Sequence, residues 1–122
     1  MMDFLYEIFK MQKKLEEAIG AEIFQKNSLQ GNSEMKDHPN QIFILLSFVG
    51  VITEACEALE QTPWKPWKES MTYNQRAFQE ELIDLLHFVL NLFLAASMEP
   101  QDVYKMFKQK HVKNMKRNER GY

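Results

Sequence analysis

The chain has 122 residues, of which 45% are hydrophobic and 26% are charged, and its formal net charge is −2. This length fits a single domain over residues 1–122, and the composition excludes an intrinsically disordered chain. The single cysteine, Cys56, excludes an internal disulfide and fits a reducing, cytoplasmic location. The longest apolar run, residues 42–52, is shorter than the roughly 20 residues that a membrane span needs, so we expect no membrane association.

Helical spacing of apolar residues runs through most of the chain. Asp3 is positioned to cap the first helix, Thr72 to cap the third, and Pro100 to occupy the first turn of the fourth. A polar loop covers residues 27–40, and a tryptophan-rich connection covers residues 64–68. The four predicted helices cover residues of about 3–24, 41–61, 73–97 and 100–118. The absence of alternating stretches predicts an all-α fold, a bundle of four to five helices.

The second and third predicted helices carry apolar side chains around their whole circumference, over residues 42–52 and 82–94. Helices of this kind are normally buried. A single small layer of four helices does not cover both, so we predict a homo-oligomer, most simply a twofold homodimer. The alternative is a compact monomer that leaves some apolar surface exposed.

Charge is distributed unevenly along the chain. Residues 105–122 carry seven basic side chains and one acidic one, whereas residues 1–104 carry eight basic and sixteen acidic ones. One interpretation of the basic segment is a solvated helix end that complements the helix dipole. The other is a binding site for an anion, for which phosphate is the usual biological candidate.

Two pairs of carboxylates interrupt the apolar helices. Glu54 and Glu57 are three residues apart on the second helix, and Glu81 and Asp84 repeat this spacing on the third. An antiparallel hairpin would bring the pairs face to face, where burial without a partner costs several kcal/mol. A hard divalent cation, Mg²⁺ or Mn²⁺, removes that cost. The alternative is a solvated acidic surface.

Other catalytic signatures are missing from the sequence. His87 and Asn91 extend the acidic stripe of the third helix, but Asp84-x-x-His87 occurs once, whereas a di-iron bundle needs two such motifs. There is no glycine-rich phosphate loop, no zinc spacing of cysteine and histidine, and no nucleophile elbow. A metal-activated water is therefore the simplest attacking group.

The carboxylate pairs Glu54-Ala-Cys-Glu57 and Glu81-Leu-Ile-Asp84 resemble the signature of the all-α nucleoside triphosphate pyrophosphatases, which include MazG-type enzymes and dimeric dUTPases. Four further stretches are similar to the dimeric dUTPase branch in particular. They are the first-helix motif around Gln12, the Trp64-Lys-Pro-Trp67-Lys68 loop, the third-helix motif from Glu81 through Asp84 to His87 and Phe88, and the tail from Lys110 through Asn114 and Arg117 to Tyr122.

The resemblance implies a role for each matching residue. Glu54, Glu57, Glu81 and Asp84 would hold Mg²⁺, and Glu57 would also orient or deprotonate the attacking water. The residues implied in binding the base are Gln12, Trp67, His87 and Phe88. Those implied in binding the phosphates are Lys110, Asn114, Arg117 and Tyr122.

These observations together predict a Mg²⁺-dependent pyrophosphohydrolase that cleaves dUTP to dUMP and pyrophosphate through attack of water on the α-phosphorus. Its partner is the nucleotide substrate, and we expect neither a nucleic acid polymer nor a membrane. The first alternative is a MazG-type pyrophosphatase of broad specificity. The second is a non-catalytic helical interaction protein with a merely solvated acidic stripe.

Overall fold

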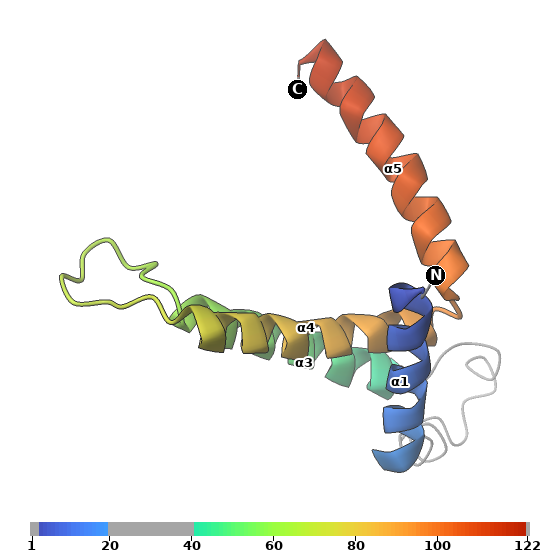
Figure 1. Cartoon of the computed structure of the whole chain (residues 1–122), viewed down its shortest axis with the longest axis horizontal. Coiled ribbons are helices and arrows are strands. Elements are labelled where there is room, and N and C mark those ends of the chain that lie inside the picture. Colours follow the sequence, from blue (N-terminus) through green and yellow to red (C-terminus); the bar gives the residue numbers. More distant parts are fainter. Residues whose placement is uncertain (1–2, 20–40, 122) are drawn as a thin grey trace.

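The computed structural model describes residues 3–19 and 41–121. All secondary structure in these ranges is helical, which confirms the predicted all-α class. The helices are α1 (Phe4–Ile19), α3 (Gln41–Glu60), α4 (Gln75–Ala95) and α5 (Pro100–Arg120). Figure 1 shows α3 and α4 as an antiparallel hairpin, with α1 crossing one end of it and α5 leading away from it. The predicted loop 27–40 and the end of the first predicted helix, residues 20–24, lie outside the described residues.

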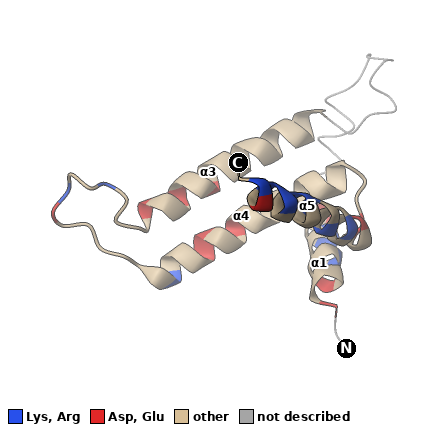
Figure 2. Ribbon diagram, turned by 90° about the horizontal axis from the view of Figure 1, so that it is seen from above, with Lys and Arg blue, Asp and Glu red and all other residues tan. Residues whose placement is uncertain are grey.

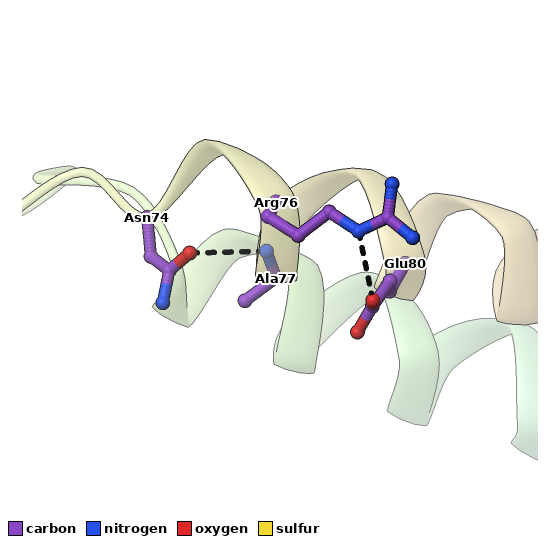
Figure 3. Close-up of polar contacts among 4 residues, drawn as sticks. All are labelled: Asn74, Arg76, Ala77 and Glu80. Carbon is purple, nitrogen blue, oxygen red and sulfur yellow. Dashed lines mark hydrogen bonds and ion pairs between the residues drawn. The ribbon is translucent and has the colours of Figure 1, made fainter.

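Local hydrogen bonds determine where the helices begin. Asp3 caps α1 as predicted, because its Oδ1 accepts the backbone N–H of Tyr6 at 3.1 Å. The prediction of Thr72 as the cap of α4 is wrong. Asn74 is the cap instead, and its Oδ1 accepts the N–H of Ala77 at 3.1 Å (Figure 3). The N–H of Asn74 also bonds to the carbonyl of Gln61 at 3.0 Å. This bond closes the hairpin loop and keeps residue 74 extended, so the helix starts after it.

The residues at both ends of α5 explain where this helix begins and ends. Pro100 occupies the first turn as predicted, and Asp102 Oδ2 accepts the backbone N–H of Glu99 at 2.8 Å. The helix continues to Arg120, two residues beyond the predicted Asn118. Gly121 then takes a φ of +75°, which favours glycine and ends the helix.

The small core lies within the hairpin and where α1 crosses it. In the hairpin, the ring of Phe88 on α4 lies directly against Gly50 of α3, where any Cβ would collide with the ring. At the crossing, the rings of Phe9 and Phe93 stack with centroids 6.2 Å apart. Phe9 and Leu90 are each 2% exposed. The absence of a side chain at Gly50 thus sets how closely α3 and α4 approach each other.

A single copy of the chain leaves much of α3 uncovered. This helix is long and apolar enough to cross a membrane. Helices α4 and α5 reach the same length and hydropathy only when taken together, and they are bent by 100° relative to each other. Within the chain, only a small share of the apolar stretch of α3 is buried. The side chains of α3 that stay exposed are Ile42, Leu45, Leu46, Phe48, Val49, Ile52 and Leu59. The predicted burial of this helix is therefore not provided by the described residues of one chain.

Candidate metal and nucleotide site

Three of the four predicted carboxylates meet between α3 and α4, in the half of the hairpin that is closer to its loop. One oxygen each from Glu54, Glu57 and Glu81 lies within 4.8 Å of the other two. The antiparallel course of α3 and α4 brings them together, as the spacing of the two pairs predicted. Asp84 is one turn beyond Glu81 on the same face of α4 and is exposed. Figure 2 shows acidic residues on both helices of the hairpin and basic residues along α5.

Crowding of like charges changes the acidity of this cluster. The pKa of Glu54 is raised from 4.5 to about 7, first by burial and then by hydrogen bonds that its protonated form donates to Glu81 and Glu57. The negative charges of Glu57 and Asp84 add to the effect. In about half of the molecules this carboxyl group is therefore still protonated at neutral pH, and a nearby positive charge would favour its ionised form.

The carboxylates fit a hard divalent cation. As ionised carboxylates, Glu54 and Glu81 each have a buried oxygen, Oε2, that accepts no hydrogen bond from the described residues. Buried polar atoms normally have partners, so two such oxygens in one cluster are an exception that a bound cation would explain. Clustered carboxylate oxygens are the donor set that Mg²⁺ and Mn²⁺ prefer.

The residues implied in base binding are not all in one place. Gln12 of α1 and His87 of α4 are in contact, with Gln12 Oε1 2.5 Å from His87 Nδ1. Phe88 packs on Gly50 inside the hairpin. Trp67 is 70% exposed in the hairpin loop, edge-to-face against Trp64, at the opposite end of the hairpin from α1 (Figure 1). One chain therefore brings together Gln12 and His87, but not Trp67.

An apolar pocket of about 280 Å³ adjoins the contact between Gln12 and His87. It lies between α1 and α4 and is close to the lower end of the size range of small-molecule sites, ~300 Å³. Its lining residues are Ile8, Met11, Ile83, Leu86, His87 and Leu90.

The residues implied in phosphate binding lie on α5, apart from the carboxylates. Lys110, Asn114 and Arg117 are all exposed. Their spacing places them on one face of the helix. The main contacts of α5 are with α1, including an ion pair of 3.6 Å between Lys13 and Glu99 at its start. Tyr122 lies outside the described residues.

The sequence analysis assigned no function to Asn91 and Glu16, two polar residues that are hydrogen-bonded to Gln12 in the structure. Asn91 was visible as the end of the polar stripe on α4, and its Oδ1 accepts from Gln12 Nε2 at 2.6 Å. Glu16 follows Gln12 by one helical turn, and its Oε1 is 3.3 Å from the same nitrogen. The spacing of four residues between Gln12 and Glu16 was the available signal.

Comparison with known proteins identifies the family of this chain. A family model described as dUTPase matches residues 4–102, which include all four carboxylates and the tryptophan-rich loop. The chain belongs to this all-α dUTPase family. The predicted resemblance to the dUTPases is thus confirmed, and the matched residues include all of α1, α3 and α4.

Three curated phage proteins are similar to part of this dUTPase-family chain. A dCTP pyrophosphatase of Enterobacteria phage LZ5 is 32% identical over 71 residues, which are 48% of this chain and 41% of that protein. The dCTP pyrophosphatase of Enterobacteria phage T4 is 31% identical over 71 residues, 48% of this chain and 42% of that protein. A DNA replication protein of phage T4 is 33% identical over 67 residues, 43% of this chain and 17% of that protein. The matched part thus spans about two fifths of each pyrophosphatase. No solved structure matches the chain.

Proposed function

We propose that this dUTPase-family protein is a Mg²⁺-dependent nucleotide pyrophosphohydrolase that converts dUTP to dUMP and pyrophosphate. The observation that carries the proposal is the meeting of Glu54, Glu57 and Glu81 with two buried carboxylate oxygens left unpartnered. Asp84, one turn beyond Glu81, would complete the set that holds the ion. Mn²⁺, which accepts the same oxygen donors, would replace Mg²⁺.

In the proposed reaction, Glu57 orients a water molecule and accepts its proton. The water oxygen forms a bond to the α-phosphorus, and the bond from that phosphorus to the bridging oxygen of pyrophosphate breaks. When bound, Mg²⁺ supplies a Lewis acid that neutralises phosphate charge. Glu57 suits the role of base because it is exposed at the edge of the cluster, whereas Glu54 is partly buried in it.

We also propose that the working unit is a homodimer in which the phosphate-binding residues come from α5 of the second copy. The apolar face of α3 and the exposed Tyr104, Phe107 and Met115 of α5 exceed what a monomer normally leaves in water. The basic α5 of one copy also complements the acidic hairpin of the other. Sedimentation equilibrium at micromolar concentration is expected to give twice the chain mass, and a monomer there would contradict the dimer.

Pyrophosphate release from a panel of nucleotides tests the activity. The panel contains dUTP, dCTP, dTTP, dATP, dGTP and the ribonucleotides, each with Mg²⁺ and with a chelator. We expect hydrolysis with Mg²⁺, fastest for dUTP. Hydrolysis of none would contradict the enzyme proposal, and equal turnover of all would favour a MazG-type enzyme of broad specificity.

The second candidate substrate is dCTP, because two of the similar phage proteins are dCTP pyrophosphatases. The same panel decides between the two pyrimidines. A melting experiment with Mg²⁺ and a non-hydrolysable dUTP analogue separates both from a non-catalytic interaction protein. Ligand at a hundredfold excess over Kd stabilises the folded chain by about 2.7 kcal/mol, whereas an interaction protein shows no change.

A further inference from the structure

The contact between α1 and α4 contains a chain of hydrogen bonds that is buried between Gln12 and Asn91 and partly buried at His87. Gln12 is 2% exposed and Asn91 is 6% exposed. Gln12 Nε2 donates to Asn91 Oδ1 at 2.6 Å, and Gln12 Oε1 lies 2.5 Å from His87 Nδ1. Buried carboxamides are costly unless such bonds satisfy them. The chain therefore holds Gln12 in one position between two residues of α4.

Glu16 determines which way the carboxamide of Gln12 faces. A carboxylate only accepts hydrogen bonds, and Glu16 Oε1 is 3.3 Å from Gln12 Nε2. The amino group must therefore face Glu16 and Asn91, and the carbonyl oxygen must face His87. A ring nitrogen that faces a carbonyl oxygen has to carry a proton. In neutral His87 the proton is thus on Nδ1, and Nε2 has a free lone pair.

His87 is the one polar residue among those that line the apolar pocket between α1 and α4. The other residues that line the pocket between α1 and α4 are all aliphatic or methionine. No described residue is bonded to His87 Nε2. A flat ring with an N–H group at its edge matches an apolar pocket with one acceptor, and the N3–H of uracil and the N4 amino group of cytosine are such groups.

We infer that Asn91 is a positioning residue for the substrate: by holding the carboxamide of Gln12, it keeps His87 as an acceptor toward the N–H edge of a pyrimidine base. This inference rests on the proposed function for its ligand. It gives Gln12 a role through His87, since both polar atoms of the Gln12 side chain are already bonded inside the protein.

The tautomer of His87 is measured directly by long-range ¹H–¹⁵N correlation spectra of the full chain with ¹⁵N-labelled histidine. The spectra are recorded without nucleotide at about pH 8.5, where free histidine is neutral. Substitution of each of the three histidines in turn assigns the signals. We expect His87 to show the Nδ1–H form. The Nε2–H form, or an even mixture of both, in the unmodified protein would overturn the inference, and this measurement requires no folded variant at position 91.

Two substitutions of Asn91 test its effect on the substrate. Asn91→Leu removes the acceptor and is expected to mix the tautomers of His87. It should raise KM for dUTP by about tenfold, the size of one hydrogen bond, with kcat within about threefold. Asn91→Asp keeps an acceptor for Gln12 and should retain the Nδ1–H form and a KM within about threefold of the unmodified protein. Circular dichroism checks the fold of each variant.

The outcomes separate this inference from the proposed function. An unmodified protein that hydrolyses no nucleotide overturns the proposed function, whereas the spectra of His87 still test the hydrogen-bond chain. An active protein in which Asn91→Leu leaves both the tautomer and KM unchanged overturns the role of Asn91 and leaves the proposed function intact. A loss of kcat equal in the leucine and aspartate variants, with unchanged tautomer, would also contradict it.

Discussion

The two helices of the hairpin, α3 and α4, have 20 and 21 residues, and α5 has 21, so the three helices are nearly equal in length. The side chains around them differ. Each helix of the hairpin packs along its partner, and Gly50 and Phe88 meet where they touch. In α5, Tyr104 is 61% exposed and Phe107 is 71% exposed. Local signals thus specify both as helices, but among the described residues only the hairpin helices pack along each other, whereas α5 contacts α1. A helix gains most of its stability from packing, so the described contacts stabilise α5 less than the hairpin.

The largest expected effect comes from removing a charge in the hairpin. Asp84→Asn should lower pyrophosphate release by 10³-fold or more, because it weakens the set of carboxylates that we propose to hold the metal. The helical content should not change, since Asp84 is exposed. Circular dichroism checks the fold, and Glu119→Gln on exposed α5 is the control for loss of one acidic charge. Wild-type activity in Asp84→Asn would show that the metal assignment is wrong.

The next effect tests whether α5 acts on its own hairpin or on that of a second copy. Lys110→Ala with Arg117→Ala should lower kcat/KM by on the order of 10²-fold, through loss of two charge-assisted contacts to phosphate. Mixing these chains with Asp84→Asn chains should restore about a quarter of the full activity. Half of the dimers are then mixed, and each has one intact site if the symmetric dimer shares its residues.

Two controls accompany the mixing experiment. Lys105→Ala with Lys116→Ala removes the same charge from positions on α5 that are about 100° or more away around the helix, and should leave kcat/KM within about threefold. A mixture of Asp84→Asn with Glu54→Gln chains has both defects in the hairpin and should recover no activity. If the first mixture also recovers none, each site uses its own α5.

Packing in the hairpin is tested by Gly50→Ala. A helical glycine replaced by alanine normally gains up to about 1 kcal/mol, but here the new methyl group collides with the ring of Phe88. We expect a loss of roughly 1–3 kcal/mol in the free energy of unfolding, measured with denaturant. Thr53→Ala, exposed on the same helix, should stay within about 0.5 kcal/mol. A stabilised Gly50→Ala variant would show that α3 and α4 are farther apart.

The carboxylate cluster should make stability depend on pH when no metal is present. The pKa of Glu54 is about 7 in the folded chain, above its ordinary 4.5, so the folded state holds the proton more tightly. The resulting stabilisation is complete below about pH 4.5 and is lost as the pH rises through 7. We expect Tm of the metal-free protein to fall by a few degrees over this range, and Glu54→Gln to abolish that fall. Mg²⁺ should raise Tm more at pH 8 than at pH 6.

The smallest effects concern the start of α4. Asn74→Ala should cost about 1 kcal/mol, because the N–H of Ala77 loses its acceptor. Arg76→Ala, which removes an exposed ion pair with Glu80 at 3.0 Å, should cost about 0.5 kcal/mol or less. Thermal melting of the two variants side by side compares a cap with a surface ion pair. Equal losses would contradict the assignment of Asn74 as the cap.

The sequence alone predicted the helices and much of the carboxylate site. Asp3 and Pro100 were recognised as helix starts because capping depends on a few neighbouring residues. The spacing of Glu54, Glu57 and Glu81 predicted their meeting, since an antiparallel hairpin of long helices leaves few other registers. Thr72 was chosen over Asn74 because the bond from Asn74 to the carbonyl of Gln61 depends on closure of the loop, which local sequence does not reveal.

Tertiary structure alone decided the surroundings of Gln12, Phe88 and α5. Gln12 and Asn91 are 79 residues apart, and their bond depends on the angle at which α1 crosses α4. Phe88 lies on Gly50 because the helices approach closely at that point. The direction of α5 follows from a turn at residues 96–99 that no periodicity encodes. Helical periodicity is a property of neighbouring residues, whereas these contacts arise from the packing of whole helices, and this is the physical reason for the difference.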